Sequence, residues 1–118
     1  MLLGSLGRNE ALGMKVRLIA LDSVEHDRKL ALNGHSVVLG RCPDADVRID
    51  DRWVSRRHCE LVEVDGMLVV RDLGSTHGTF VNGRQVSEAR LRPDDKLTIG
   101  LTSFVASYRP LSRLVRAC

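Results

Sequence analysis

Aromatic side chains make up only 3% of the 118 residues, and the sequence holds three prolines and three cysteines. A hydrophobic core must therefore come from Val, Leu, Ile and Ala, a composition that favours packing between β-strands. No apolar run approaches the roughly 18–20 residues needed to cross a bilayer, so no membrane association is expected. The opening residues also lack the charged region of a signal peptide, and we expect none. This length allows one domain with its own core.

The cysteines show no disulfide pattern. There is no CxxC pair, and an odd count leaves one thiol unpaired in any scheme, which favours a reducing compartment and a cytoplasmic protein. Cys59 lies in an apolar–polar alternation and is predicted to be a small core residue, whereas Cys118 is predicted to be an exposed thiol. The histidines and cysteines lack the close-spaced pairs of zinc sites, so neither a metal nor a cofactor is expected. The residues considered are His26, His35, His58 and His77 with Cys42 and Cys59.

The body of the chain has no excess of either charge. The formal net charge is +3, but Arg109, Arg113 and Arg116 lie in a closing segment without acids, which leaves residues 1–108 with 15 basic and 15 acidic side chains. A nucleic-acid interface needs basic residues gathered on the folded surface, so nucleic-acid binding is not expected. We predict a flexible extension over 1–14, one domain over 15–108 and a basic tail over 109–118. Leu111, Leu114 and Val115 of that tail could form one helical turn, which is too short to be stable alone.

The apolar residues alternate with period two and not with a helical period. Between Lys15 and Leu21, apolar Val16, Leu18 and Ala20 are spaced as in a half-buried strand. Three dipeptides predict two-residue hairpin turns between strands: Asn33-Gly34, Asp65-Gly66 and Asn82-Gly83. Two further alternating sets close the chain: Leu97, Ile99 and Leu101, then Phe104, Ala106 and Tyr108. Because no stretch of 11 residues before Tyr108 has an amphipathic helical face, we predict an all-β, antiparallel sandwich of two twisted sheets.

Special residues gather in three clusters between the predicted strands. They are Gly40-Arg41, then Ser55-Arg56-Arg57-His58, then Gly74-Ser75-Thr76-His77-Gly78-Thr79 with Asn82-Gly83 after it. A guanidinium supplies a planar fork of donors that can meet two oxygens of a phosphate, and a serine hydroxyl adds a short donor. In order and spacing, together with Asp46-Val47-Arg48-Ile49 and Asp72-Leu73, these clusters resemble the signature of the forkhead-associated (FHA) domain. The resemblance extends from about Val16 to Tyr108.

This resemblance implies a phosphothreonine-binding module, with the binding loops at one end of the sandwich and no enzymatic activity. Arg41, Ser55 and Arg56 would hold the phosphate, and Thr76 would contact the threonine methyl. His77 stands where many family members carry an Asn that holds the peptide backbone, so we expect a partial replacement there. The partner would be a phosphothreonine-containing substrate of a Ser/Thr kinase. Similar domains select the residue three positions after the phosphothreonine with the loop before Ser-x-x-His, here Arg52 and Trp53.

The remaining motif residues are expected to be structural. By resemblance, His58 ties the recognition loops together, and Asn82 ties its own loop to a neighbour. Gly40 belongs to the Gly-Arg motif, while Gly78 and Gly83 serve backbone conformation. A Ser55–His58 catalytic pair is not expected, because no orienting group or oxyanion site accompanies it.

Simpler alternatives stay open for the binding residues. Arg41 could pair with Asp44 or Asp46 on the surface, Ser55 could cap a turn, and Arg56 could be solvated, as Arg57 is expected to be. Two other functions also remain: a scaffold that binds proteins independently of phosphate, and a nucleic-acid binder that uses the loop and tail arginines.

Overall fold

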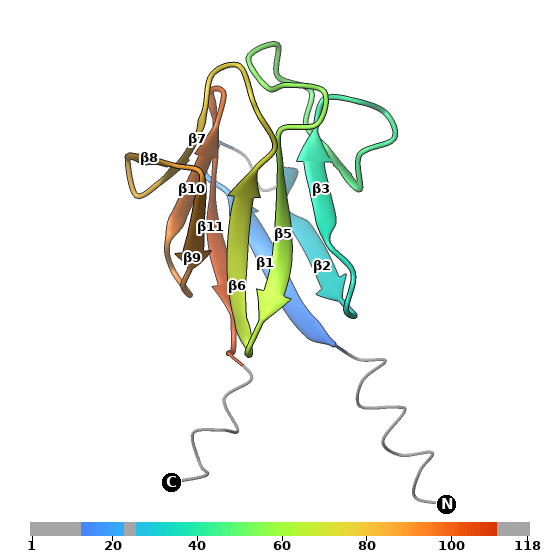
Figure 1. Ribbon diagram of the computed structural model, residues 1–118, viewed down its shortest axis with the longest axis vertical. Coiled ribbons are helices and arrows are strands. Elements are labelled where there is room, and N and C mark those ends of the chain that lie inside the picture. Colours follow the sequence, from blue (N-terminus) through green and yellow to red (C-terminus); the bar gives the residue numbers. More distant parts are fainter. Residues whose placement is uncertain (1–12, 23–25, 111–118) are drawn as a thin grey trace, which may run out of the picture.

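The computed structural model describes residues 13–22 and 26–110, which form two packed β-sheets (Figure 1). The first sheet has the order β2-β1-β11-β10-β7-β8. Its strands are β1 (Met14–Ala20), β2 (Arg28–Leu32), β7 (Thr79–Val81), β8 (Arg84–Val86), β10 (Lys96–Ile99) and β11 (Thr102–Tyr108). The second sheet has the order β4-β3-β5-β6-β9. Its strands are β3 (Val37–Gly40), β4 (Val47–Arg48), β5 (Cys59–Val64), β6 (Met67–Asp72) and β9 (Glu88–Leu91).

The predicted all-β sandwich is confirmed. All strand pairs are antiparallel except β3 and β4, which run parallel. Val16, Leu18 and Ala20 point into the core from β1, as their alternation predicts, and the described residues contain no α-helix. None of the described segments is therefore a helix able to span a membrane. Cys59 is fully buried, as predicted, and burial raises the pKa of its thiol to about 12.

Two of the three predicted hairpins are confirmed. Asp65-Gly66 joins β5 to β6, and Asn82-Gly83 joins β7 to β8. Both residues of each dipeptide have positive φ, at 51° and 81° in the first turn and 50° and 85° in the second. These angles are those of a type I′ turn, whose twist matches the twist of the strands it connects.

The hairpin predicted at Asn33-Gly34 is wrong. Strand β2 pairs with β1 in the first sheet, whereas β3 pairs with β5 and β4 in the second, so this link crosses between sheets. Only Gly34 has a positive φ, and Asn33 does not, so the type I′ geometry is not formed. The prediction that Leu101 continues a strand is also wrong. Leu101 lies in the turn after β10, next to Gly100 with its φ of 62°, and is 81% exposed.

The ends of the predicted domain lie near the limits of the described residues. Met14, assigned to the extension, is the first residue of β1 and is buried. The rest of that extension up to residue 12 lies outside the described residues. The same holds for residues 111–118, which include the tail's apolar positions, Arg113, Arg116 and Cys118.

The connections that carry the sequence clusters lie together at one end of the sandwich. In Figure 1 the links after β3, β6 and β10 lie at the upper end, while β1 begins and β11 ends at the lower one. With the link between β4 and β5, whose backbone bonds to the link after β3, four separate stretches of sequence meet at the upper end.

Candidate functional site

Gly40 brings the end of β3 into contact with the loop before β5. A Cβ atom at this position would lie 2.0 Å from the carbonyl oxygen of Arg56, so only glycine fits. The close approach allows the backbone N–H of Arg41 to donate to the carbonyl of Ser55 at 3.0 Å, and that of Cys42 to donate to Arg56 at 3.1 Å. Arg41 and Ser55 are thereby fixed side by side, although 13 residues separate them in sequence.

The Arg41 side chain is held by one nitrogen and exposes the others. Its Nε donates to the carbonyl of Val54 at 3.0 Å, which fixes the plane of the guanidinium. Among the described residues no ion pair involves Arg41, so the alternative pairing with Asp44 or Asp46 is not formed. The carboxylate of Asp46 instead accepts from the backbone N–H of Val38 at 2.8 Å. The two terminal nitrogens of Arg41 are left as a fork of donors.

The hydroxyl of Ser55 joins two loops and keeps a donor. Its Oγ accepts from the backbone N–H of Thr76 at 3.0 Å, which brings the β6–β7 loop against the β4–β5 loop. Because the oxygen is the acceptor in this bond, its own proton remains available to an anion. Arg56 follows directly and is exposed, as is Thr76. The predicted phosphate-holding and methyl-contacting residues therefore lie together.

His58 lies beneath this cluster and is completely buried. Its Nδ1 accepts from the backbone N–H of Ser55 at 3.0 Å, and its Nε2 lies 2.8 Å from the carbonyl of Gly78. An acceptor at Nδ1 and a donor at Nε2 together define the neutral tautomer with its proton on Nε2. Both ring nitrogens are occupied by backbone groups, so neither is left to act as a base on Ser55. The histidine ties the Ser55 loop to the Gly78 loop.

Two aspartates shape the loops around the cluster. Asp72 accepts from the backbone N–H groups of Gly74 and Ser75 at 2.9 and 3.0 Å and from the hydroxyl of Thr79 at 2.7 Å. Asp51 accepts from the backbone N–H groups of Trp53 and Leu101, both at 2.8 Å. In the sequence Asp72 stands out only as part of a motif, and no motif indicates Asp51.

The residues expected to select the peptide form a separate surface beside the cluster. Trp53 is 42% exposed and meets His77 edge to face, with ring centroids 4.9 Å apart. The guanidinium of Arg52 lies 5.9 Å from the centre of the Trp53 ring. Trp53 and His77, with Phe80 and Leu101, line a small pocket of about 190 Å³. The structure therefore joins His77 to the predicted specificity residues.

A match to a family model covers residues 37–100, which is more than half of the chain. The model is that of the FHA domain. This chain belongs to the FHA domain family. The predicted resemblance is thereby confirmed. The matched segment runs from the start of β3 to just after β10.

Curated proteins similar to this FHA domain include a regulator and an enzyme inhibitor. The glycogen accumulation regulator GarA of Mycolicibacterium smegmatis is 46% identical over 73 residues, which are 62% of this chain and 46% of that protein. The oxoglutarate dehydrogenase inhibitor of Corynebacterium diphtheriae is 38% identical over 72 residues, which are 61% of this chain and 50% of that protein. The matched segment thus spans about half the length of these relatives.

Solved FHA domains have the same architecture. A structure from a study of phosphothreonine-dependent FHA domain interactions has a TM-score of 0.74 and 33% identity, covering 82% of this chain and 99% of that one. The FhaA FHA domain, solved in complex with the intracellular domain of Rv3910, has a TM-score of 0.69 and 34% identity over 77% of this chain and 98% of that one. Both likenesses cover nearly the whole of the other domain.

Asn82 and Gly83 lie away from the recognition loops of the FHA domain. The Asn82 side chain accepts from the backbone N–H of Lys96 at 2.9 Å and donates to Asp95 at 3.0 Å. These bonds tie the β7–β8 turn to the loop before β10, at the opposite end of β7 from Gly78. Gly78, in contrast, has a φ of 94° within the recognition loop itself.

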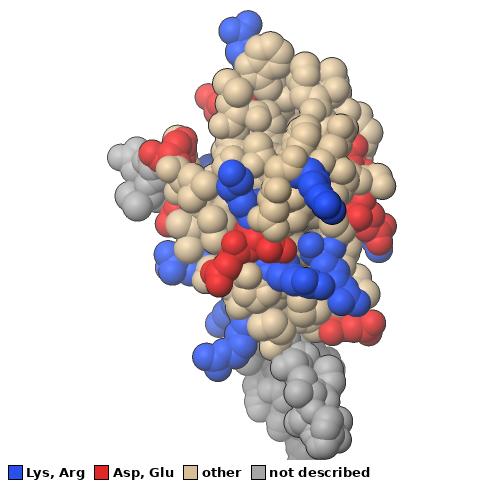
Figure 2. Space-filling view, turned by 90° about the vertical axis from the view of Figure 1, so that its left-hand side faces the viewer, with Lys and Arg blue, Asp and Glu red and all other residues tan. Residues whose placement is uncertain are grey.

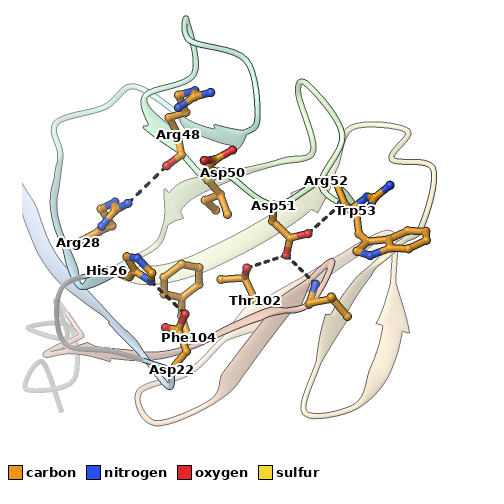
Figure 3. A pocket seen from close by; sticks show the side chains of 12 residues that line it. Asp22, His26, Arg28, Arg48, Asp50, Asp51, Arg52, Trp53, Thr102 and Phe104 are labelled. Atoms are coloured by element: carbon orange, nitrogen blue, oxygen red, sulfur yellow. Dashed lines mark hydrogen bonds and ion pairs between the residues drawn. The ribbon is translucent and has the colours of Figure 1, made fainter.

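A larger pocket of about 520 Å³ lies on the other side of Trp53 (Figure 3). Its lining residues include His26 and six charged residues: Asp22, Arg28, Arg48, Asp50, Asp51 and Arg52. Asp51 uses its carboxylate on the β10–β11 turn, where it also accepts from the Thr102 hydroxyl at 2.7 Å. Arg28 and Arg48 are likewise bound to backbone carbonyls. Cations and acids alternate here, so no single ligand charge is favoured.

The hydrogen bonds of Asp51 should stabilise the domain less in acid than at neutral pH. Burial raises the pKa of Asp51, but hydrogen bonds from Thr102, Trp53 and Leu101 outweigh it and hold the pKa below its ordinary 3.8. A lowered folded-state pKa contributes stability that is present above 3.8 and lost as pH falls through the folded-state value. Thermal unfolding between pH 7 and 2.5 should therefore show that Asp51→Asn is less stable than the parent at neutral pH. Its stability should also fall less than that of the parent as the pH is lowered.

Asp50→Asn is the matched control for this series, because Asp50 is an exposed neighbour with no hydrogen bond among the described residues. The stability of Asp50→Asn should equal that of the parent at every pH. Equal acid slopes for the parent and Asp51→Asn would show that the carboxylate of Asp51 does not hold the loops.

Proposed function

We propose that this FHA domain binds phosphothreonine in an extended peptide through the upper end of the sandwich. The observation that carries the proposal is the Arg41–Ser55 pair: a backbone hydrogen bond holds a residue with a fixed guanidinium beside a residue with a hydroxyl donor. A phosphate dianion accepts from such donors through several oxygens at once, and Arg56 adds a second cation next to them. Its family membership and the solved FHA domain interactions that depend on phosphothreonine support the same function.

In this proposal, Thr76 lies against the methyl group of the phosphothreonine. Its N–H is already used by Ser55, so the residue is held in place while its side chain stays exposed. Burial of one methyl contributes only about 0.8 kcal/mol, so the preference over phosphoserine must also come from packing in the loop.

His77 and Trp53 would contact the peptide beyond the phosphate. An imidazole offers one donor and one acceptor, which is part of what the Asn of other family members provides. The contact with Trp53 orients the His77 ring and makes the two side chains one surface. Trp53 and Arg52 would then select the residue three positions after the phosphothreonine, as the exposed aromatic ring in a chain poor in aromatics suggests.

The domain would act as a non-catalytic regulator that recognises substrates of a Ser/Thr kinase in the cytoplasm. The buried, fully bonded His58 supports this, since it leaves Ser55 without a base among the described residues. The regulator and inhibitor named among its relatives support it as well. The domain would bind the dianion of the phosphate group. Because the second proton is lost near pH 6, affinity should rise as the pH increases through about 6.

Fluorescence polarisation tests the proposal with three ligands: a phosphothreonine peptide library, the same library unphosphorylated, and single-stranded DNA, each across a salt series. Only the phosphothreonine library should bind. In the same assay, Trp53→Ala should lose the ranking at the third position after the phosphothreonine. Equal binding of the unphosphorylated library would favour a phosphate-independent scaffold. A dominant response to DNA with a steep salt slope would instead favour a nucleic-acid binder.

A further inference from the structure

A groove of about 460 Å³ opens where both sheets end, on the side of the sandwich that carries β8 and β9. These are the terminal strands of the two sheets, and the single residue Ser87 joins them. The groove lies along the strands and not in the recognition loops. Figure 2 views the molecule from this side, and charged side chains of both signs cross the middle of the face while its upper end is mostly uncharged.

Three arginines line the groove: Arg84, Arg90 and Arg92. All three are exposed, and within residues 13–22 and 26–110 none of their guanidinium groups makes an ion pair or a hydrogen bond. Arg84 is paired in register with buried Val81, so its side chain lies on the face of β8 that is directed toward the other sheet. A cation therefore lies at the mouth of the space between the sheets.

Two acids near the groove, Asp95 and Glu88, are already bound to other groups. Asp95 is the acid that lines it, and its two oxygens accept from the side chain of Asn82 at 3.0 Å and from the backbone N–H of Arg92 at 2.8 Å. Glu88, on β9, lies 3.3 Å from the guanidinium of Arg71. Three guanidinium groups thus face a single lining carboxylate, in a chain whose residues 1–108 carry 15 basic and 15 acidic side chains.

The floor of the groove is apolar. Val81 is 8% exposed, and Val86 and Ala89 are partly buried and pack against the core. Small apolar side chains can pack against a floor of this kind, and the guanidinium groups at its rim can donate hydrogen bonds to carboxylates. A nucleic-acid backbone has phosphates but no small apolar side chains for the floor, and the balanced charge of the chain body provides no broad positive field for it.

We propose that this groove binds an acidic segment of a protein partner, in which carboxylates alternate with small apolar residues. The binding needs no phosphate and does not use the recognition loops. A partner that carries both a phosphothreonine and an acidic segment would then bind at two sites, and the linkage would raise its overall affinity above that of either site alone.

Amide chemical shifts test this groove directly. The probe is an unphosphorylated ten-residue peptide of alternating Glu and Ala, with an alternating Gln–Ala peptide as its neutral match. The acidic peptide should shift the amides between residues 82 and 92, and the neutral peptide should not. The double variant Arg84→Gln/Arg92→Gln should weaken the acidic peptide about tenfold, since each exposed ion pair contributes a modest amount.

Lys29→Gln is the matched control, because Lys29 is an exposed cation on β2, at the opposite edge of the same sheet from β8. It should leave binding unchanged, and so should Arg41→Ala, which separates this proposal from the phosphothreonine site. The proposal is overturned if the shifts centre on residues 41–58 and 73–78, or if Lys29→Gln weakens binding as much as the double variant. Displacement of the peptide by an equal concentration of single-stranded DNA ten nucleotides long would also overturn it.

Discussion

Arg41→Ala should weaken binding of a good phosphothreonine peptide by about 2–4 kcal/mol, or about thirtyfold to several hundredfold, because a charged acceptor would lose its bidentate partner. The effect should be large because the guanidinium is fixed in advance by its Nε bond to Val54. Little side-chain entropy is then lost when the phosphate binds. Titration of the purified variant with a fluorescent phosphothreonine peptide measures the change.

Two further variants show whether charge or geometry carries this effect. Arg41→Lys keeps the charge but removes the planar fork, so its affinity should fall between those of the parent and Arg41→Ala. Arg57→Ala removes an equal charge from an exposed position of the same loop and should change affinity only slightly. If Arg41→Ala and Arg57→Ala weakened binding equally, the phosphate would be held by the general positive charge of the loop and not by Arg41.

The fold was predictable where local chemistry decides it, and not where distant pairing does. Asp65-Gly66 and Asn82-Gly83 each take the positive φ angles of a type I′ turn, and each joins two strands whose register begins directly at the turn. Asn33-Gly34 has the same composition, but β2 has a longer partner in β1, with five residue pairs in register. Pairing across the sheets therefore overrides the turn preference of one dipeptide, which no local pattern can indicate.

The residues of the site also fall into those that sequence motifs indicate and those that only the fold brings together. The recognition loops could be found from their ordered motifs, which carry Arg41, Ser55 and His58. Asp51 could not be found, because its bonds to Leu101 and Thr102 join residues 50 and 51 positions apart. The same applies to the contact of Trp53 with His77, which two different loops bring together. Asp72 did carry a signal, since an acid two residues before a glycine often caps the next turn.

His58→Ala should destabilise the domain by about 3–5 kcal/mol, because it opens a cavity and leaves the N–H of Ser55 and the carbonyl of Gly78 unpaired. For a domain of this size the midpoint of thermal unfolding should fall by roughly 10–25 °C. His77→Ala, at an exposed histidine of the same loops, should change stability by only about 0.5 kcal/mol. Both midpoints are read from thermal unfolding followed by circular dichroism.

Phosphopeptide affinity of His58→Ala, measured at a temperature where the variant is still folded, distinguishes loop positioning from simple packing. His58→Phe fills the cavity but restores neither hydrogen bond, so it should regain part of the stability and little of the affinity. Ser55 would then have lost the bond that holds its backbone, and the Thr76 N–H would have lost a fixed acceptor with it. Parental affinity in a folded His58→Phe variant would mean that the bond from Arg41 to Ser55 alone positions the phosphate donors, and that His58 serves only to fill the core.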